Sequence, residues 1–310
     1  MSQSCEQTMD YKEITIDPGD LDVLLEKEWL ITNSRGSYAS GTIIGCNTRR
    51  YHGMLVASLR PPVERIVTVG NLLESVKIGE KSYDISSFEF SDCIHPQGFR
   101  YLKRFRSDSG VHFYYDLDGV ELEKSIYLCY ETDRVVVSYS LKGLAGRQGA
   151  ITVSPMLVLR DFHAMQNSAT PLSVRYENDI VTVHHLDPKG PAAHITMPGG
   201  YFEQDSNWWY SMKYRVDAFR GQQDHEDVCA VGSFHHTISG DTTVSLIISA
   251  SSGSQCKEDM NITLEQIRQQ RQSRRDELYE KAKAVTDEEK LLVLAADQVV
   301  VRRAISNTQV

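Results

Sequence analysis

The densest group of side chains suited to chemistry lies in residues 28–56, where aromatic, amide and basic residues stand among glycines. Arg49, Arg50, Tyr51 and His52 are consecutive in this stretch. Such side chains donate hydrogen bonds to sugar hydroxyls, and an aromatic face packs on a sugar ring, so the pattern predicts a carbohydrate contact. In the alternative interpretation, both arginines pair with buried carboxylates and the glycines only turn strands. Residue types alone favour this alternative.

The same stretch holds further aromatic and amide residues suited to a sugar contact. They are Trp29, Asn33, Tyr38 and Asn47. The glycines among them do not follow the G-x-G-x-x-G or phosphate-loop spacing, so a nucleotide site is not predicted.

A second cluster follows a strand-like run and comprises Arg160, Asp161 and His163. These residues should lie at the end of that strand or in the next loop, where functional side chains concentrate. An internal ion pair between Arg160 and Asp161 that closes the strand end explains the cluster equally well.

A third cluster contains an aromatic run at 207–215, then Arg220, and then the adjacent carboxylates Glu226 and Asp227. If the run is a strand, its two neighbouring tryptophans point to opposite faces, so at most one of them contacts a ligand. The two carboxylates either bind a ligand or pair with Arg215 or Arg220.

Catalytic residues are not predicted, although glycoside hydrolysis needs only two carboxylates about 5 to 9.5 Å apart. With 42 acidic residues, no pair can be singled out, and the chain lacks H-E-x-x-H, G-x-S-x-G and Walker motifs. The histidine pairs 184–185 and 235–236 are adjacent in sequence, and adjacent strand residues point apart. We therefore expect neither a metal nor a cofactor.

Composition limits the partners and the compartment. The 310 residues are 41% hydrophobic and 24% charged, with a net charge of −9, which indicates a globular chain that repels nucleic acid and anionic membranes. The first ten residues lack the apolar core of a secretory signal, and the six cysteines are widely spaced. We expect reduced thiols and a cytoplasmic protein.

Strands are expected over most of the chain, and they would hold the three clusters. Apolar and β-branched runs separated by turn signals, with no helix between them, predict a mainly β fold of two large packed antiparallel sheets. The predicted strands include 101–105, 111–115, 120–128, 135–141, 150–159, 172–175, 180–185, 193–197, 208–216 and 243–250.

Helices are predicted only after a break at 251–254. Two capping-box sequences, Thr263 to Gln266 and Thr286 to Glu289, precede a polar helix over 267–277 and a second helix over 290–303. The second helix has one strongly apolar face that needs a cover, so the chain has the pattern of a β domain, a linker and the start of a helical domain.

Several motifs together resemble one family. The run Asn47-Thr-Arg-Arg-Tyr-His-Gly53, the Arg-Asp-Phe-His run at 160–163, and the Arg-Gly and Glu-Asp pairs at 220–221 and 226–227 occur in the order found in bacterial and archaeal glycogen debranching enzymes. The resemblance to their amino-terminal domain covers residues 25 to 250. Residues 291–303 resemble the first helix of that family's catalytic domain.

The resemblance implies a domain plan and a function. It implies an extension at 1–24, a β-supersandwich at 25–252, a helical linker at 253–285, and at 286–310 the first helix of an (α/α) barrel that carries the catalytic acids. This chain would be a non-catalytic domain that supports the barrel and helps to bind α-glucan such as glycogen or maltooligosaccharide. The clusters named above would line the glucan path or the seam between domains.

Two other interpretations of the chain's function remain open. The chain is either a self-sufficient α-glucan-binding or interaction module, or itself a hydrolase that uses acids such as Asp161 and Glu226. Without a partner domain, the apolar face of the last helix would be expected either to pair two chains into a homodimer or to remain disordered.

Overall fold

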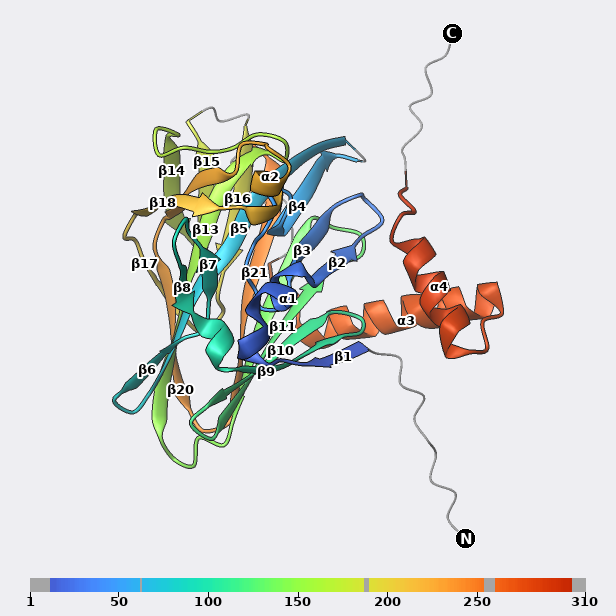
Figure 1. The fold of residues 1–310 in the computed structure, drawn as a ribbon, viewed down its shortest axis with the longest axis horizontal. Helices are drawn as coiled ribbons and strands as arrows, with labels where there is room; N and C mark the ends of the chain where they lie inside the picture. The colour runs from blue at the N-terminus through green and yellow to red at the C-terminus, as the bar shows by residue number, and fades with distance from the viewer. Residues whose placement is uncertain (1–11, 62, 187–189, 254–259, 303–310) are drawn as a thin grey trace.

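The protein is mainly β, with two large antiparallel sheets packed face to face, as the sequence predicts (Figure 1). The computed structural model describes residues 12–61, 63–186, 190–253 and 260–302. All strand pairings in these ranges are antiparallel.

The first sheet has nine strands. In spatial order they are β1 (Lys12–Thr15), β9 (Leu102–Ser107), β10 (Val111–Leu117), β11 (Val120–Leu128), β12 (Arg134–Lys142), β21 (Thr242–Ser252), β16 (Pro191–Thr196), β15 (Ile180–His185) and β14 (Leu172–Glu177). Because β1 pairs with β9, part of the expected N-terminal extension lies in this sheet.

The second sheet has ten strands. Its main path is β17 (Tyr201–Glu203), β20 (Ser233–Ser239), β13 (Gln148–Asp161), β5 (Val63–Ile78), β4 (Gly53–Arg60), β3 (Tyr38–Thr42) and β2 (Glu28–Thr32); β6 (Lys81–Asp84), β18 (Asn207–Lys213) and β19 (His225–Ala230) pair alongside. A small hairpin, β7 (Ser87–Glu89) with β8 (Ile94–Gln97), lies over one face.

The main core fills the space between the two sheets. Strand β11 illustrates the cause, because Val120, Leu122 and Ile126 alternate with polar residues and are fully buried. A second apolar cluster, which includes Phe88, packs β7 and β18 on the outer face of the ten-stranded sheet.

Short helices interrupt the strands, which corrects the prediction of an uninterrupted β region. They are η1 (Pro18–Asp20), α1 (Leu21–Glu26), η2 (Gly98–Arg100) and α2 (Arg215–Phe219). The strand predicted over 208–216 therefore ends at Lys213. Local composition favours a strand there, but the contact of the Asp217 carboxylate with Arg50 fixes a helical turn.

The C-terminal helices are α3 (Leu264–Ala282) and α4 (Asp287–Asp297), and both begin with the predicted capping boxes. Helix α3 packs Ile267 against Tyr127 on the outer face of the nine-stranded sheet. Helix α4 ends at Asp297, earlier than predicted; residues 303 and beyond lie outside the described ranges. Figure 1 shows α3 running away from the sheets, with α4 folded beside it.

Candidate functional site

The segment we call the arginine loop comprises residues 43–52 and joins β3 to β4. Gly45 has φ +76°, which turns the chain, and the Asn47 side chain donates to the Gly70 carbonyl at 2.8 Å. The Val216 amide at the start of α2 donates to the Thr48 carbonyl at 3.0 Å. The loop and α2 are therefore held together by main-chain contacts.

Arg50 is the hub of this assembly. Its backbone amide and its Nε donate to the two oxygens of Asp217, at 2.7 and 3.3 Å. Its Nη1 and Nη2 donate to the carbonyls of His163 and Gln223, at 3.0 and 2.6 Å. One largely buried guanidinium thus joins the arginine loop, α2, the loop after β13 and the loop after α2.

Arg160 and Glu226 form a buried bidentate ion pair that the sequence did not predict. The Nε of Arg160 donates to Oε1 of Glu226, and its Nη2 donates to Oε2 at 2.8 Å. The same carboxylate accepts from the Tyr214 hydroxyl at 2.6 Å and from the Gln166 amide at 2.7 Å. Arg160 therefore pairs with Glu226, and not with Asp161 as the alternative for that cluster proposed.

The Glu226 carboxylate has no spare capacity for chemistry. Its side chain is 0% exposed and all four of its contacts are donors. The charge of Glu226 raises the pKa of Arg160 against the opposing effect of burial, while burial raises the pKa of Tyr214 well above its usual value. The expected partners Arg215 and Arg220 lie elsewhere: Arg215 pairs with acids of β7 and α1.

Asp227 holds strand β18 and the loop after β13 through their main chains. Its Oδ1 accepts from the Ser211 amide at 2.9 Å and its Oδ2 accepts from the Ser168 amide at 3.0 Å. Ser211 has φ +57° at an irregularity in the pairing of β18 with β19. Asp227 therefore satisfies amides that the strand ladder leaves open.

Glu28, Arg49 and His52 form a second, more exposed charge cluster. The Arg49 Nε lies 2.6 Å from Glu28 Oε1, and His52 Nε2 lies 3.5 Å from the same atom. Partial burial raises the pKa of Glu28, but hydrogen bonds from His52 and Arg49 outweigh it and lower the pKa to about 2. His52 is itself fixed, because its Nδ1 accepts from the Thr48 amide at 3.1 Å.

Trp29, Asn33 and Tyr38 are engaged in structure. The Trp29 indole is 5% exposed and donates to the Thr42 carbonyl at 3.0 Å. Asn33 accepts from two amides of its own turn and donates to the Thr132 carbonyl at 2.9 Å. The Tyr38 hydroxyl donates to the Tyr51 carbonyl at 2.9 Å, and burial raises the pKa of Tyr38 to about 12.

Only part of this assembly is exposed to solvent. Asp161, His163 and Arg220 are exposed, and Tyr51 makes edge contacts with Phe162 and His163 at 5.5 and 5.9 Å. Phe219, the last residue of α2, is 91% exposed. The structure therefore brings the three predicted clusters together around Arg50 and Arg160, and it exposes the edges of the loops that these arginines tie down.

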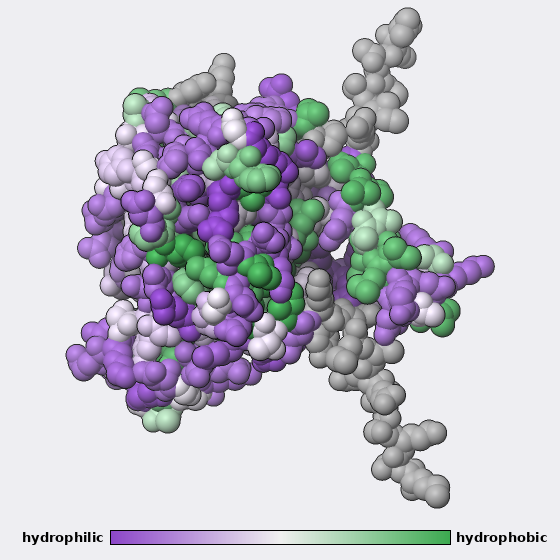
Figure 2. Space-filling model, viewed as in Figure 1, coloured by the Kyte–Doolittle hydropathy of each residue, from purple (hydrophilic) through white to green (hydrophobic). Residues whose placement is uncertain are grey.

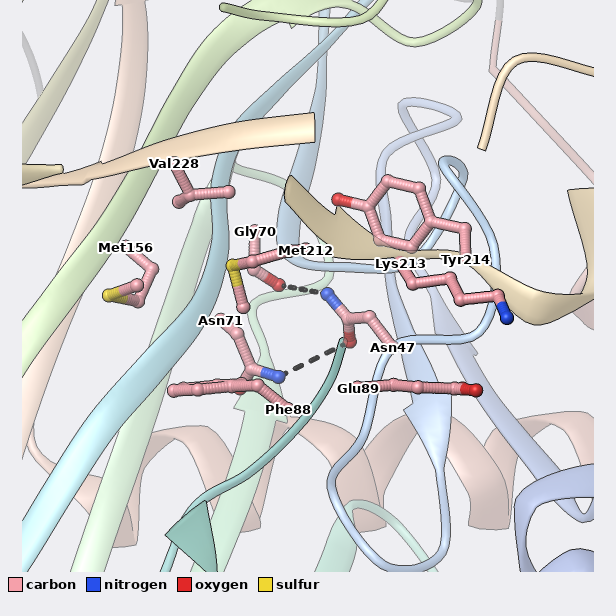
Figure 3. Close-up of a pocket in the computed structure, with 10 residues that line it drawn as sticks. All are labelled: Asn47, Gly70, Asn71, Phe88, Glu89, Met156, Met212, Lys213, Tyr214 and Val228. Atoms are coloured by element: carbon pink, nitrogen blue, oxygen red, sulfur yellow. Dashed lines mark hydrogen bonds between the residues drawn. The ribbon is translucent and has the colours of Figure 1, made fainter. Parts of the chain in front are cut away.

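Two cavities adjoin the arginine loop. The first lies beside Asn47 and admits only about 10 Å³, roughly one water (Figure 3). The second is an open cleft of about 720 Å³ between the sandwich and the α3–α4 pair, and its lining includes Glu28, Trp29, Arg274 and Leu291. Because Glu28 also binds Arg49, the cleft and the arginine loop adjoin each other.

A family model described as glycogen debranching enzyme N terminal matches residues 27–245. The chain belongs to this family. The match confirms the resemblance drawn from the motifs, and it includes the arginine loop, Arg160 and Glu226 in the glycogen debranching enzyme N-terminal domain. A search of curated proteins found no match.

Solved structures show only weak likeness. A bacterial glucoamylase complexed with acarbose has 9% identity and a TM-score of 0.39, covering 80% of this chain and 34% of that chain. A chain assigned as a kojibiose phosphorylase, from the human microbiome, has 10% identity and a TM-score of 0.40, covering 92% and 37%. This chain thus spans about a third of the length of each of these two structures. Likeness at this level supports no argument about function.

The described residues include neither a metal-binding group nor a membrane-spanning helix. No group of three or more His, Cys, Asp or Glu side chains among them is arranged to hold a metal ion. No helix in the described ranges is long and apolar enough to cross a membrane.

Proposed function

We propose that this glycogen debranching enzyme N-terminal domain is non-catalytic, supports a catalytic domain, and contributes to α-glucan binding. The observation that carries the proposal is the use of Glu226 and Asp217 as counter-ions for Arg160 and Arg50. Acid–base catalysis on a glycosidic bond needs one carboxyl that can hold a proton and another that can act as base or nucleophile. Glu226 is saturated by four donors and does neither, and Asp217 is held by the amide and the guanidinium of Arg50, so we assign both acids to holding loops.

The surface offered to the partner domain or to glucan is the exposed rim of the same assembly. His163 and Arg220 supply donors there, and Phe219 supplies an apolar ring. Because the loops are tied by Arg50, the rim is held in place before binding, which lowers the entropy cost of association.

The apolar face of α4 is proposed to pack against the catalytic domain. Leu291 and Leu292 are 59% and 71% exposed, and Figure 2 shows hydrophobic side chains gathered over this helix. In the chain alone, we expect this face to form a homodimer. Analytical ultracentrifugation of the chain and of Leu291→Glu/Leu292→Glu tests this, with an expected shift from dimer to monomer; a monomeric parent chain would contradict it.

Glucose release from a branched α-glucan tests the absence of catalysis. The purified chain should release no glucose at an enzyme-like rate, because the two carboxylates at the centre of the assembly, Asp217 and Glu226, serve as counter-ions of Arg50 and Arg160. Asp161→Ala serves as the control if any release is seen: Asp161 is exposed, so loss of activity in this variant would assign hydrolysis to this chain and reject the proposal.

A self-sufficient α-glucan-binding module is the second candidate, favoured by a sandwich core that is closed within the chain. Calorimetric titration with maltoheptaose separates the two. A module binds unaided, whereas a supporting domain binds only weakly until its partner domain is added. Phe219→Ala/Arg220→Ala should reduce binding in either case, because both side chains are exposed and their loss leaves the fold intact.

A further inference from the structure

The outer face of the ten-stranded sheet carries a row of side chains that no part of the arginine loop contacts. Direct strand partners place Tyr201 of β17, His235 of β20, Thr152 of β13, Ser75 of β5 and Asp84 of β6 in one line across five strands. Side chains of direct partners share a face, so all five point the same way. We call them the outer row.

The neighbours of the outer row along each strand confirm its direction. Phe234, Val153, Val76 and Tyr83 are buried in the core between the sheets. Since successive strand residues alternate between faces, the outer row points to solvent. With strands about 4.8 Å apart, the row is on the order of 19 Å long.

The row begins with a stacked pair of rings. The Tyr201 and His235 rings lie 5.0 Å apart at an interplanar angle of 23°, and Tyr201 is 60% exposed. The Thr152 hydroxyl lies 3.1 Å from Nδ1 of His235, and this contact fixes the imidazole ring on which Tyr201 stacks. Tyr201 is therefore an exposed ring held in place by a second ring, and it requires little further ordering to accept a flat apolar partner.

Hydroxyl and carboxylate groups flank the rings. Glu203 is exposed and its Oε2 lies 3.7 Å from Nε2 of His235, while Ser233 and Ser154 exchange a hydrogen bond of 2.7 Å between their hydroxyls. Carboxylates and hydroxyls accept hydrogen bonds from sugar hydroxyls. The five residues of the outer row include one carboxylate and no arginine or lysine, and Lys77, two residues from Ser75 on β5, adds one exposed cation to the same face.

We infer that the outer row is a second α-glucan contact, in which Tyr201 packs on one glucose ring and the polar residues bind hydroxyls of the following units. The inference rests on the proposed glucan-binding function, and it adds a site on β17, β20 and β13 that is separate from the rim around Arg50. A row of this length accommodates a chain of several sugar units across the strands. The protein alternative is strand addition at the edge strand β17, which is disfavoured because β17 has only three residues.

The test is calorimetric titration of the full chain with maltoheptaose. Tyr201→Ala should weaken binding by about tenfold, because it removes a stacking contact. Tyr210→Ala is the matched control, since Tyr210 on β18 is also 60% exposed but lies outside the row, and its affinity should stay within about twofold of the parent. Tyr201→Phe retains the ring and should bind like the parent chain.

The remaining outcomes separate this inference from the proposed function. If the parent binds maltoheptaose and Tyr201→Ala binds equally well while Phe219→Ala/Arg220→Ala does not, the outer row is rejected and the rim around Arg50 is retained. If the parent chain shows no binding with or without its partner domain, both are rejected. A Tyr201→Ala effect on sedimentation with unchanged affinity identifies β17 as a protein contact and also rejects the sugar site.

Discussion

Each large sheet carries a buried charge cluster, and the two clusters are built from different cations. At the end of β13, Arg160 is paired with Glu226 and keeps its charge at all physiological pH values. On the outer face of the nine-stranded sheet, His112 lies between Asp108 and Glu123, with 2.9 Å contacts to each. The first cluster keeps its cation at all these pH values, whereas the second has a cation only while the His112 imidazole holds its second proton.

The largest effect is expected from Glu226→Gln. Removing the charge leaves the Arg160 guanidinium buried without its counter-ion, which should cost about 3–5 kcal/mol of unfolding free energy. Urea denaturation measures the loss. Glu177→Gln is the control, because its pair with Arg175 is exposed and should contribute less than about 1 kcal/mol.

The double variant Arg160→Met/Glu226→Leu sharpens the interpretation. It removes both charges, so most of the lost stability should return if the cost arises from an unpaired buried charge. A double variant as unstable as Glu226→Gln would instead assign the loss to packing. If Glu226→Gln loses less than about 1 kcal/mol of unfolding free energy, the Arg160 pair contributes no more than an exposed ion pair. The proposed difference between the two clusters would then be rejected.

Features that depend on neighbouring residues could be predicted from the sequence, and features that depend on distant residues could not. Strand β11 has the predicted bounds, and both capping boxes form, because alternation and caps are set within a few residues. Arg50 and Asp217 are 167 residues apart. Among 42 acidic residues, nothing local identifies Asp217 as the partner.

The roles of the site residues also divide into those that the sequence could predict and those that depend on distant residues. The sequence identified Arg50, Arg160 and Glu226 as notable but could not say which of them face one another. Phe219 is prominent only because the structure exposes its ring on a tied-down loop. Its exposure depends on how α2 packs, which no local pattern encodes.

The second prediction concerns pH and the His112 cluster. Burial lowers the pKa of His112, but the hydrogen bonds that its ring donates to Asp108 and Glu123 outweigh this effect and raise the pKa above 6.5. Hydrogen bonds from His112 lower the pKa of Glu123 to about 2, and the pKa of Asp108 is also lowered, although burial opposes that shift. Arg106, Tyr114, Tyr127 and, from α3, Arg268 also face this cluster.

Stability should therefore fall on both sides of a window. The contribution of His112 is complete below about pH 6.5 and is lost as pH rises through its higher folded pKa. The contributions of Asp108 and Glu123 are complete above about pH 4.5 and are lost as pH falls through their lower folded pKa values. Urea unfolding from pH 4 to 9 should show a maximum between about 4.5 and 6.5 from this cluster.

The His112→Asn variant separates the contribution of His112 from those of the two carboxylates. The variant should lose the alkaline decline, whose slope approaches at most about 1.4 kcal/mol per pH unit for one proton, and its loss of stability should shrink as pH rises. Glu226→Gln should leave the alkaline decline unchanged, since an arginine does not titrate there. Equal slopes in the parent chain and in His112→Asn would contradict the contrast between the two clusters.

The smallest effect on stability is expected at Arg49, which extends the comparison to a half-exposed pair. Its side chain and that of Glu28 are 27% and 32% exposed, so Arg49→Gln should cost less than about 1 kcal/mol. The pKa of Glu28, about 2 in the parent chain, should rise while staying below its usual value because His52 still donates. Carboxyl resonances followed by NMR across a pH titration measure this shift. A loss as large as that of Glu226→Gln would mean that burial does not separate structural ion pairs from surface pairs in this domain.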